Sequence, residues 1–475
     1  MERRNFIKNS AALASVSLLP ASAWALTKGK KLRTAHIGLG AMGKEDLLAI
    51  SSHAHVEVMA LCDVDGTNLA AAKKLHPNAQ VFSDYRKMLA ELKGSIDAVI
   101  VSTPDHTHAP ASIMAMDMGK PVYCQKPLTH HVSEARAMRK LASDKNLVTQ
   151  MGIQVHSFYD YKLATLLIQS GIIGKVHTVH AWSPKNWGDD GPTPEGSDTI
   201  PENLDWNLWL GTAPERPYKE GVYHPGNWRK VLDFGCGTLG DMGVHIFDTP
   251  YNALELDVPK TIINNCRKPT GFGFPEKNMV TYEFPGTKYT AQSLKWIWYD
   301  GPGAPEMDED LKLPNASSPK EASKTKNDES VEDKTSLDAK ISGDGKLPEQ
   351  GAMFVGDKGR LLLPHFMQLP KKIVNGEYVD ISAEIAEVEK VNKMGKPIRN
   401  YSSEGPKHYH QFVDACLGKG ECTAPFSYAA RLTETILLGV IAGRFPNQTL
   451  HWDSEKAKFA EEEANKFLDA SYRDF

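Results

Sequence analysis

The segment Leu32–Gly43, with the sequence LRTAHIGLGAMG, decides the fold. It begins as a short run rich in apolar residues and ends in the pattern Gly38-x-Gly40-x-x-Gly43, which leads into a helical pattern. In such a turn the first glycine permits the tight bend, the second lets the backbone approach a pyrophosphate, and the third lets helix and strand pack closely. The start of the following helix offers unpaired N–H groups and a partial positive charge to the phosphates. We therefore predict a strand, turn and helix that bind a dinucleotide, with a purely structural glycine turn as the alternative.

An acidic residue at the end of the next apolar run supports this prediction. The run Val56–Cys62 is followed by Asp63, which lies 25 residues after Gly38. A carboxylate at this point accepts hydrogen bonds from the ribose hydroxyls and repels a 2′-phosphate. The sequence therefore favours NAD over NADP as the cofactor.

The rest of the chain predicts two domains of the α/β class. Short apolar runs alternate with helical patterns as far as residue 152, which is typical of a Rossmann domain with a doubly wound parallel sheet over residues 31–152. The runs after Val56–Cys62 are Asp97–Ser102, Pro121–Cys124 and Val148–Ile153. Beyond residue 153 the strands become longer, which favours a second α/β domain with an open, mostly antiparallel sheet over residues 153–455. We expect a C-terminal helix over residues 456–475.

Composition excludes several classes of protein. The 475 residues are 41% hydrophobic and 24% charged with a net charge of −4, so the chain is globular and carries no basic signature for nucleic acid. Its six cysteines form no CxxC pair, which argues against a zinc ribbon or a thioredoxin-like site. Residues 301–350 contain no aromatic residue and are rich in Ser, Pro, Gly and charged residues. We interpret them as a mobile surface insertion, or alternatively as a substrate lid or interface loop.

The N-terminus resembles an export signal. Arg3 and Arg4 form a twin-arginine pair before the apolar stretch Ala11–Leu19, and Ala21-Ser22-Ala23 is a small-x-small cleavage pattern. We predict that residues 1–25 are a twin-arginine signal peptide, which would direct the folded protein to the periplasm or outside the cell. The apolar stretch is too short to span a membrane comfortably. A short N-terminal helix or a single membrane anchor are the alternatives.

Two further motifs follow predicted strands of the Rossmann domain. Thr103-Pro104-x-x-x-His108 follows the run Asp97–Ser102, and Gln125-Lys126-Pro127 follows the run Pro121–Cys124. Together with the glycine turn they resemble the glucose–fructose oxidoreductase/inositol dehydrogenase (Gfo/Idh/MocA) family. The resemblance implies that Lys126 points at the reacting sugar carbon, and Gln125 replaces the glutamate that the family usually has. It also implies a cofactor site made of Gly38, Gly40, Ala41, Met42, Gly43, Asp63, Thr103, Pro104, His108 and Lys126.

The stretch Gly235–Asp248 is also similar to the family. Asp241 and His245 lie four residues apart, which places both on one face of a helix, and Asp248 continues that stripe. The resemblance implies that His245 accepts the proton and that Asp241 orients the substrate, so the catalytic residues would be Lys126, Asp241 and His245. A neutral imidazole can take a hydroxyl proton, and a cationic lysine stabilises alkoxide character. Two alternatives are a metal site made of Asp241, His245 and Asp248, and a merely structural histidine; we expect no metal.

Aromatic and polar residues that suit a sugar ring complete the candidate site, and those expected to touch the substrate are Gln154, His156, Trp228 and Arg229. We expect an NAD-dependent oxidoreductase that moves hydride to or from a secondary alcohol of a sugar, cyclitol or glycoside, possibly with its cofactor retained. The alternative is a redox-neutral glycosidase that uses NAD for oxidation, elimination and re-reduction. A sugar-binding relative without activity is a third, weaker alternative. The expected partners are a small carbohydrate and further copies of the chain, with the exposed face of the second sheet as the contact surface, and neither nucleic acid nor a stable membrane span.

Overall fold

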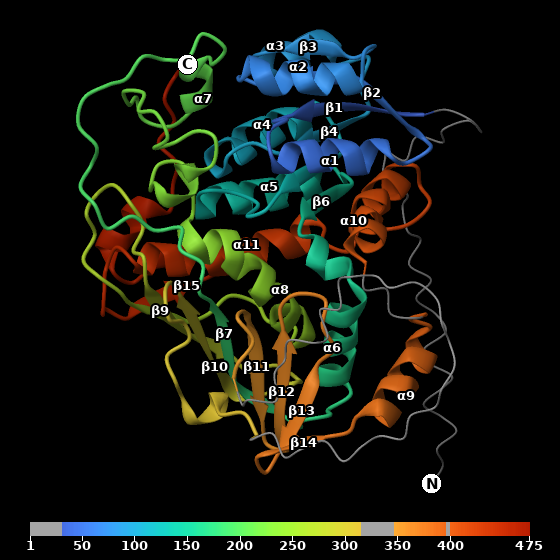
Figure 1. Ribbon diagram of the computed structural model, residues 1–475, viewed down its shortest axis with the longest axis vertical. Coiled ribbons are helices and arrows are strands. Elements are labelled where there is room, and N and C mark those ends of the chain that lie inside the picture. The colour runs from blue at the N-terminus through green and yellow to red at the C-terminus, as the bar shows by residue number, and fades with distance from the viewer. Residues whose placement is uncertain (1–30, 315–345, 396–399) are drawn as a thin grey trace.

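A computed structural model describes residues 31–314, 346–395 and 400–475. The N-terminal half forms a parallel six-stranded sheet in the order β3-β2-β1-β4-β5-β6, so the strand order reverses beside β1 and β4 (Figure 1). A ligand cleft is expected at the carboxyl ends of strands at such a reversal. The strands are β1 (Leu32–Ile37), β2 (Val56–Cys62), β3 (Gln80–Phe82), β4 (Ala98–Val101), β5 (Val122–Gln125) and β6 (Thr149–Gly152).

Helices cover both faces of this sheet, which explains its apolar strands: all four residues of β4 are buried. Two helices begin at aspartates whose side chains accept backbone N–H groups, Asp65 from Thr67 and Asp84 from Arg86. The predicted doubly wound parallel sheet is confirmed. The helices are α1 (Met42–Ser51), α2 (Gly66–Leu75), α3 (Tyr85–Leu92), α4 (Asp105–Asp117) and α5 (Val132–Asp144).

The second sheet has ten strands in the order β14-β13-β12-β11-β7-β10-β9-β8-β15-β16. Only the pairing of β7 with β10 is parallel among its described strands, so the predicted mostly antiparallel sheet is confirmed. The strands are β7 (Val176–Ser183), β8 (Thr261–Asn265), β9 (Asn278–Pro285), β10 (Thr290–Asp300), β11 (Gly351–Gly356), β12 (Gly359–Pro364), β13 (Lys371–Val374), β14 (Glu377–Val379), β15 (Leu450–Asp453) and β16 (Lys458–Phe459).

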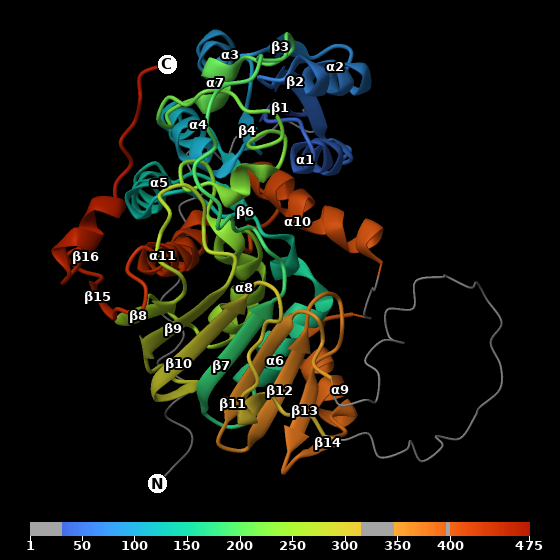
Figure 2. The same ribbon diagram turned by 60° about the vertical axis from the view of Figure 1, so that its left-hand side comes forward.

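Helices α8 and α11 lie between the second sheet and the Rossmann domain (Figures 1 and 2). Helix α11 packs on α5, and α10 packs on α1, so the C-terminal third of the chain returns to the first domain. The remaining α-helices are α6 (Tyr159–Gln169), α7 (Trp206–Leu210), α8 (Val244–Ala253), α9 (Ser382–Asn392), α10 (Tyr401–Cys416) and α11 (Phe426–Ala442).

The segment 184–235, which we call the cover segment, folds over the Rossmann domain. A β-bridge joins Leu204 to Asp65, and the Asn203 carbonyl accepts the Gly66 N–H at 2.7 Å. The segment has its own small core, in which Trp206 and Trp209 stack with ring centroids 4.7 Å apart. The cleft described below is closed by these contacts between the cover segment and residues 65 and 66, which lie far from it in the sequence.

The end of the chain differs from the expectation. Instead of a helix over residues 456–475, the structure has β16 and a 3-10 helix, Glu462–Phe467. The Ala460 N–H donates to the His451 carbonyl, and the Asn465 side chain bonds to both backbone groups of Phe459. These tertiary contacts satisfy the backbone without a helix.

The described ends of the predicted insertion pack on the sheet. Leu311 is fully buried against the face that points away from α8, and the Trp182 indole donates to the Pro348 carbonyl at 2.9 Å. These parts of residues 301–350 are therefore ordered contacts of the fold, and residues 315–345 lie outside the described residues. The predicted signal peptide, residues 1–25, lies outside them as well. Within the described ranges, no helix is long and apolar enough to cross a membrane.

Candidate active site

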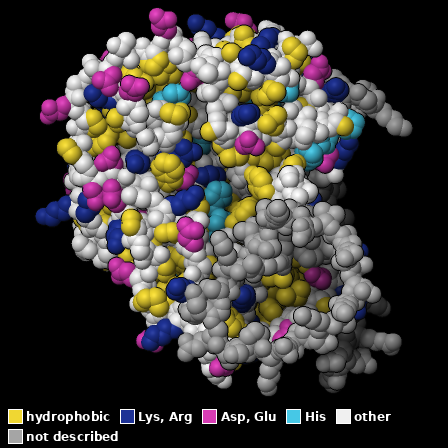
Figure 3. Space-filling view, viewed as in Figure 1, with side chains coloured by type: hydrophobic (Ala, Val, Ile, Leu, Met, Phe, Trp, Pro, Cys, Tyr) yellow, Lys and Arg dark blue, Asp and Glu magenta, His cyan; other side chains and the backbone are white. Residues whose placement is uncertain are grey.

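A cavity of about 310 Å³ lies between the carboxyl edge of the parallel sheet and the cover segment. On the face shown in Figure 3, histidine and basic side chains gather where the two domains meet. The cavity brings together most of the predicted site residues: Gly38, Gly40, Ala41, Met42, Asp63, Thr103, Pro104, His108, Lys126, Gln154, Trp228, Arg229, Asp241 and His245. The carboxyl ends of β1, β2, β4, β5 and β6 lead into ten of them. The other four, Trp228, Arg229, Asp241 and His245, come from the second half of the chain.

The glycine turn is shaped for close approach of a ligand. Gly38 has a φ of +85°, and a Cβ there would lie 2.5 Å from the Ser102 carbonyl oxygen. A Cβ on Gly43 would lie 2.3 Å from the Gly38 carbonyl oxygen, so this third glycine serves helix–strand packing. Helix α1 begins after Ala41 with no side-chain cap, which leaves the start of the helix open toward the cavity. These features fit the diphosphate of a dinucleotide.

Asp63 lies at the end of β2 and lines the same cavity. Its carboxylate accepts the backbone N–H groups of Leu39 at 2.7 Å and Asp65 at 2.8 Å, which ties it to the glycine turn. Burial raises the pKa of Asp63 above its ordinary value, although these two N–H groups oppose the shift. The position suits a group that meets the ribose of the cofactor.

Lys126 and Asp241 form the polar centre of the cavity. The Lys126 ammonium donates to Asp241 Oδ1 at 2.8 Å and to the Asp241 carbonyl oxygen at 2.9 Å. Arg229 Nε donates to the same carboxylate oxygen at 3.1 Å. Burial alone would raise the pKa of Asp241, but the two cations hold it well below its ordinary value. The site therefore contains a permanently ionised carboxylate that orients two cationic donors.

His245 begins the first turn of α8 and lines the cavity beside this centre. Burial, with a contribution from the nearby Lys126, lowers its pKa well below the ordinary value. Its buried Nδ1 makes no hydrogen bond within the described residues. The ring is therefore neutral at physiological pH, and the residue is partly exposed where it lines the cavity, as a general base requires.

Sequence reasoning missed Asp105, a buried carboxyl group at the first position of α4 that also lines the cavity. Burial raises its pKa to about 7, although Arg229 and Lys126 oppose the shift. The aspartate stood next to Pro104 in the predicted motif, but only its burial in the fold marks it as unusual.

A second missed feature is a network around Asp46 in α1. The Gln125 amide donates to both Asp46 oxygens at 2.9 Å, and Ser102 and Tyr409 hydroxyls donate at 2.6 and 2.8 Å. Gln125 also accepts the Lys126 N–H at 3.2 Å. The glutamine that departs from the family pattern thus faces a buried carboxyl group and steadies the backbone of Lys126.

Three predicted residues have a more structural role than expected. Both ring nitrogens of His108 lie 2.8 Å from carbonyl oxygens, those of Thr103 and Pro127, so the ring bridges two site loops. The Gln154 amide donates to the Tyr409 hydroxyl at 2.8 Å. Trp228 is buried under the Arg229 guanidinium, with 4.3 Å from Cζ to the ring centroid.

The structure separates His156 from the other predicted substrate residues. Its Nδ1 lies 2.9 Å from Asp248, whose carboxylate also accepts the Tyr428 hydroxyl at 2.7 Å. Both residues line a different cavity, of about 490 Å³, beside α6. The sequence predicts His156 in the substrate site because polar residues of this stretch suit a sugar ring, but Gln154 and His156, both in the 3-10 turn Gln154–Ser157, line different cavities.

The alternative metal site is not formed either. Residues Leu239–Gly243 adopt a π-helical turn before α8 begins, and Asp241 binds Lys126 whereas Asp248 binds His156. Within the described residues, these two carboxylates and His245 do not form a group with metal-binding spacing.

The cover segment contributes a further residue that the sequence did not reveal. His224 Nε2 lies 2.9 Å from Asp65 Oδ2, and the Trp209 indole donates to His224 Nδ1 at 3.2 Å. This chain of contacts fastens the cover segment over the end of the cavity that Asp63 lines.

Comparisons with known proteins agree with the two-domain fold and with a nucleotide site in the first domain. Residues 32–153 match the model of the oxidoreductase family for its NAD-binding Rossmann fold, and residues 162–264 match that for its C-terminal α/β domain. A glycosyl hydrolase family 109 protein of Stenotrophomonas maltophilia is 42% identical over 136 residues, 26% of this chain and 29% of that protein. An inositol 2-dehydrogenase of Corynebacterium glutamicum is 30% identical over 152 residues, 31% of this chain and 44% of that protein.

These matches span less than half the length of either relative. Among solved structures, the WlbA dehydrogenase of Bordetella pertussis, in complex with NADH and UDP-GlcNAcA, superposes with a TM-score of 0.59 at 14% identity. That superposition covers 90% of this chain and 99% of the dehydrogenase, which establishes a shared fold. Both family matches, the fold and the composition of the cleft agree, and they assign residues 32–153 and 162–264 to the two domains of the Gfo/Idh/MocA oxidoreductase family.

Proposed function

We propose that this protein is an NAD-dependent oxidoreductase that moves hydride to or from a secondary alcohol of a sugar, cyclitol or glycoside. The observation that carries the proposal is the placement of Lys126, Asp241 and His245 in the same cavity as the glycine turn. NAD, when bound, supplies the acceptor for the hydride.

The side chains divide the remaining work among them. Lys126 donates a hydrogen bond to the substrate oxygen and stabilises negative charge that develops on it. Asp241 keeps Lys126 and Arg229 oriented through the bonds described above. His245, which lines the cavity and is neutral because its pKa is lowered, takes the hydroxyl proton as the hydride leaves the same carbon. In the reverse direction the protonated ring returns that proton.

Substrate class is inferred from the wall of the cavity. Trp228 and Trp209 offer apolar ring surface, and Arg229 offers planar donors beside them. Such a combination suits a polyhydroxylated ring, which has an apolar face and hydroxyl groups at its rim. The names of the similar proteins, an inositol dehydrogenase and a dehydrogenase bound to a sugar nucleotide, support a substrate of this kind.

A redox-neutral glycosidase is the second candidate, in which oxidation of a sugar carbon permits elimination of the aglycone. Water then adds to the resulting double bond, and the hydride returns to the oxidised carbon. The similarity to a glycosyl hydrolase family 109 protein, at 42% identity, favours it. The same three residues would serve, because this reaction begins and ends with the same hydride and proton transfers.

One experiment separates the two candidates. The purified protein is incubated with p-nitrophenyl glycosides and with free sugars, and aglycone release and nicotinamide reduction are followed together. The dehydrogenase predicts nicotinamide reduction without cleavage. Sustained aglycone release without net nicotinamide reduction would contradict it and establish the glycosidase.

Cofactor choice gives a separate prediction. We expect NAD to bind at least about tenfold more tightly than NADP, because the Asp63 carboxylate repels a 2′-phosphate. Asp63→Asn removes the charge and keeps an oxygen for the Leu39 N–H. The dissociation constants for NAD and NADP should therefore become more similar in this variant. Asp117→Asn, at an exposed position on α4, is the control. Equal dissociation constants for the two cofactors in the original protein would refute this role of Asp63.

We also propose twin-arginine export and self-association. The Arg3–Arg4 pair supports export, and a variant with Arg3→Lys and Arg4→Lys should remain in the cytoplasm when cells are fractionated. Equal amounts of the variant and the original protein in the periplasmic fraction would refute it. Self-association through the outer face of the second sheet is a separate proposal, and light scattering on the purified protein would then give more than the monomer mass.

A further inference from the structure

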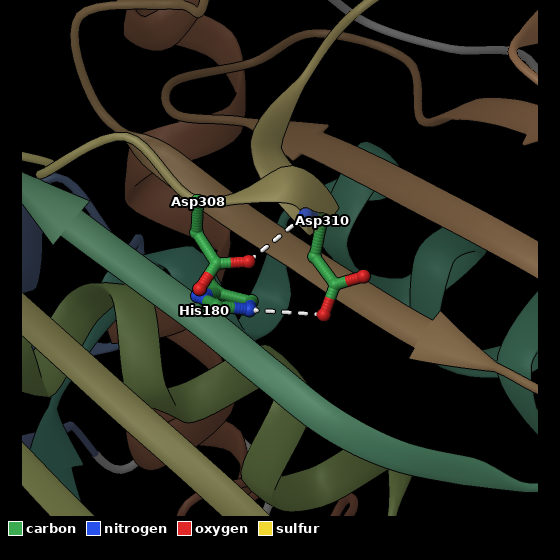
Figure 4. A group of neighbouring side chains, drawn as sticks. All are labelled: His180, Asp308 and Asp310. Atoms are coloured by element: carbon green, nitrogen blue, oxygen red, sulfur yellow. Dashed lines mark hydrogen bonds and ion pairs between the residues drawn. The ribbon is translucent and has the colours of Figure 1, made fainter.

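A group of three possible metal ligands lies on the outer face of the second sheet, away from the candidate active site. His180 belongs to β7, Asp308 precedes the 3-10 helix Glu309–Leu311, and Asp310 lies within that helix (Figure 4). One ligand atom from each of the three lies within 4.8 Å of the other two. Because neighbours alternate along a strand, His180 and Trp182 face outward while Val179 and Ala181 face the helix layer.

The imidazole of His180 is buried and aimed at the two carboxylates. The residue is 1% exposed, and its ring stacks parallel to that of Tyr299, with 5° between the planes. The Tyr299 hydroxyl lies 3.2 Å from Nδ1 and fixes the ring orientation. Nε2 is buried, makes no hydrogen bond within the described residues, and lies 3.5 Å from Asp310 Oδ2. A buried ring nitrogen without a hydrogen bond costs free energy, and a cation shared with the two carboxylates would remove that cost.

The two carboxylates are held in place and are available. Asp308 accepts the Asp310 N–H with one oxygen at 2.9 Å, which leaves its other oxygen free for a ligand. Arg360 donates to the backbone carbonyl of Asp310 and not to its carboxylate. In the described part of the chain, neither carboxylate forms an ion pair with a lysine or arginine. The buried Leu311 anchors this turn against the sheet.

We propose that His180, Asp308 and Asp310 bind one divalent transition-metal cation of the Zn²⁺ type, which fastens the segment 301–314 to the outer face of the sheet. One imidazole and two carboxylates are a suitable donor set for such a cation, and water completes the coordination. Ca²⁺ and Mg²⁺ prefer sites made of oxygen alone and are excluded by the imidazole. The hydrogen bond of Nδ1 to Tyr299 is the outer contact that orients a ligating histidine.

The test compares zinc binding by the original protein and by two variants, all of which keep the turn at residues 308–310. In Asp308→Asn/Asp310→Asn the amide of residue 308 still accepts the N–H of residue 310, so the fold is preserved while both negative charges are removed. Asp380→Asn is the matched control, because Asp380 is exposed and accepts the Ser382 N–H at 2.9 Å, as Asp308 accepts the N–H two residues later. Each full-length protein is freed of metal with a chelator and titrated with ZnCl₂ by calorimetry.

We expect the original protein and Asp380→Asn to bind one equivalent of Zn²⁺ that the double variant lacks or binds on the order of 100-fold more weakly. Zn²⁺ should also raise the unfolding temperature of the first two proteins and leave that of the double variant unchanged. CaCl₂ should neither bind at this site nor raise the unfolding temperature of the original protein. The same stoichiometry and affinity in all three proteins, or no zinc binding by the original protein, would overturn the proposal. None of these measurements depends on the oxidoreductase reaction.

Discussion

Lys126→Ala is expected to lower kcat/KM by on the order of 10² to 10³ while the protein still binds NAD. The Lys126 ammonium is the cation best placed to meet a substrate oxygen, because it lies in the cavity and is oriented by Asp241 at 2.8 Å. Its removal takes away a donor that matters most as charge develops on that oxygen. The loss should therefore fall mainly on kcat.

Two further variants define the role of Lys126. Lys120→Ala is the control, since that amino group donates to the Ile96 carbonyl at 2.8 Å, outside the cavity, and activity should be retained. Lys126→Arg keeps the positive charge but replaces the compact ammonium group with a planar guanidinium, so its kcat/KM should remain low. Full activity of Lys126→Ala in a folded protein would show that another group stabilises the substrate oxygen.

His245→Gln is expected to lower the rate by on the order of 10² to 10⁴, because the base that takes the hydroxyl proton is lost. Glutamine preserves much of the volume and polarity, so cofactor affinity should change little. His177→Gln, at an exposed position on β7, is the control.

The dependence on pH gives His245 a second test. Burial lowers the pKa of His245, so the ring stays in its basic, neutral form as the pH falls through the ordinary histidine range. Alcohol oxidation by the original protein should therefore not decline between about pH 8 and pH 6.5, the usual histidine pKa, and the acid limb should lie lower. An acid limb centred near pH 6.5 that disappears in His245→Gln would contradict the buried, neutral imidazole.

The sequence predicted what depends on local pattern. The glycine turn, the Asp63 position and the alternation of strands with helices all follow from short-range rules, and the cleft at the carboxyl edge follows from the parallel sheet. The family resemblance implies that Lys126 and Asp241 both belong to the catalytic site. It does not predict the bond between them, because 115 residues separate them in the sequence.

What the sequence could not predict depends on distant contacts. Asp46 bonds to Tyr409 across 363 residues, and no local pattern marks either of them as part of one network. His156 was placed wrongly because a short 3-10 turn decides its direction. The sequence predicts a mobile surface insertion around Asp308, whereas Leu311 is buried against the sheet and anchors this part of the segment.

The central claim is that hydride transfer occurs in the cavity that Lys126 and His245 line. The most direct measurement follows the near-ultraviolet absorbance of reduced nicotinamide when a panel of sugars, cyclitols and glycosides is added to the NAD-loaded protein. The same panel is applied to the Lys126→Ala/His245→Gln variant, after NAD binding has been checked. We predict that at least one substrate produces reduced nicotinamide with the original protein and none does so with the variant at a comparable rate. Equal rates in the two proteins would contradict the account, as would the absence of both nicotinamide reduction and aglycone release across the panel.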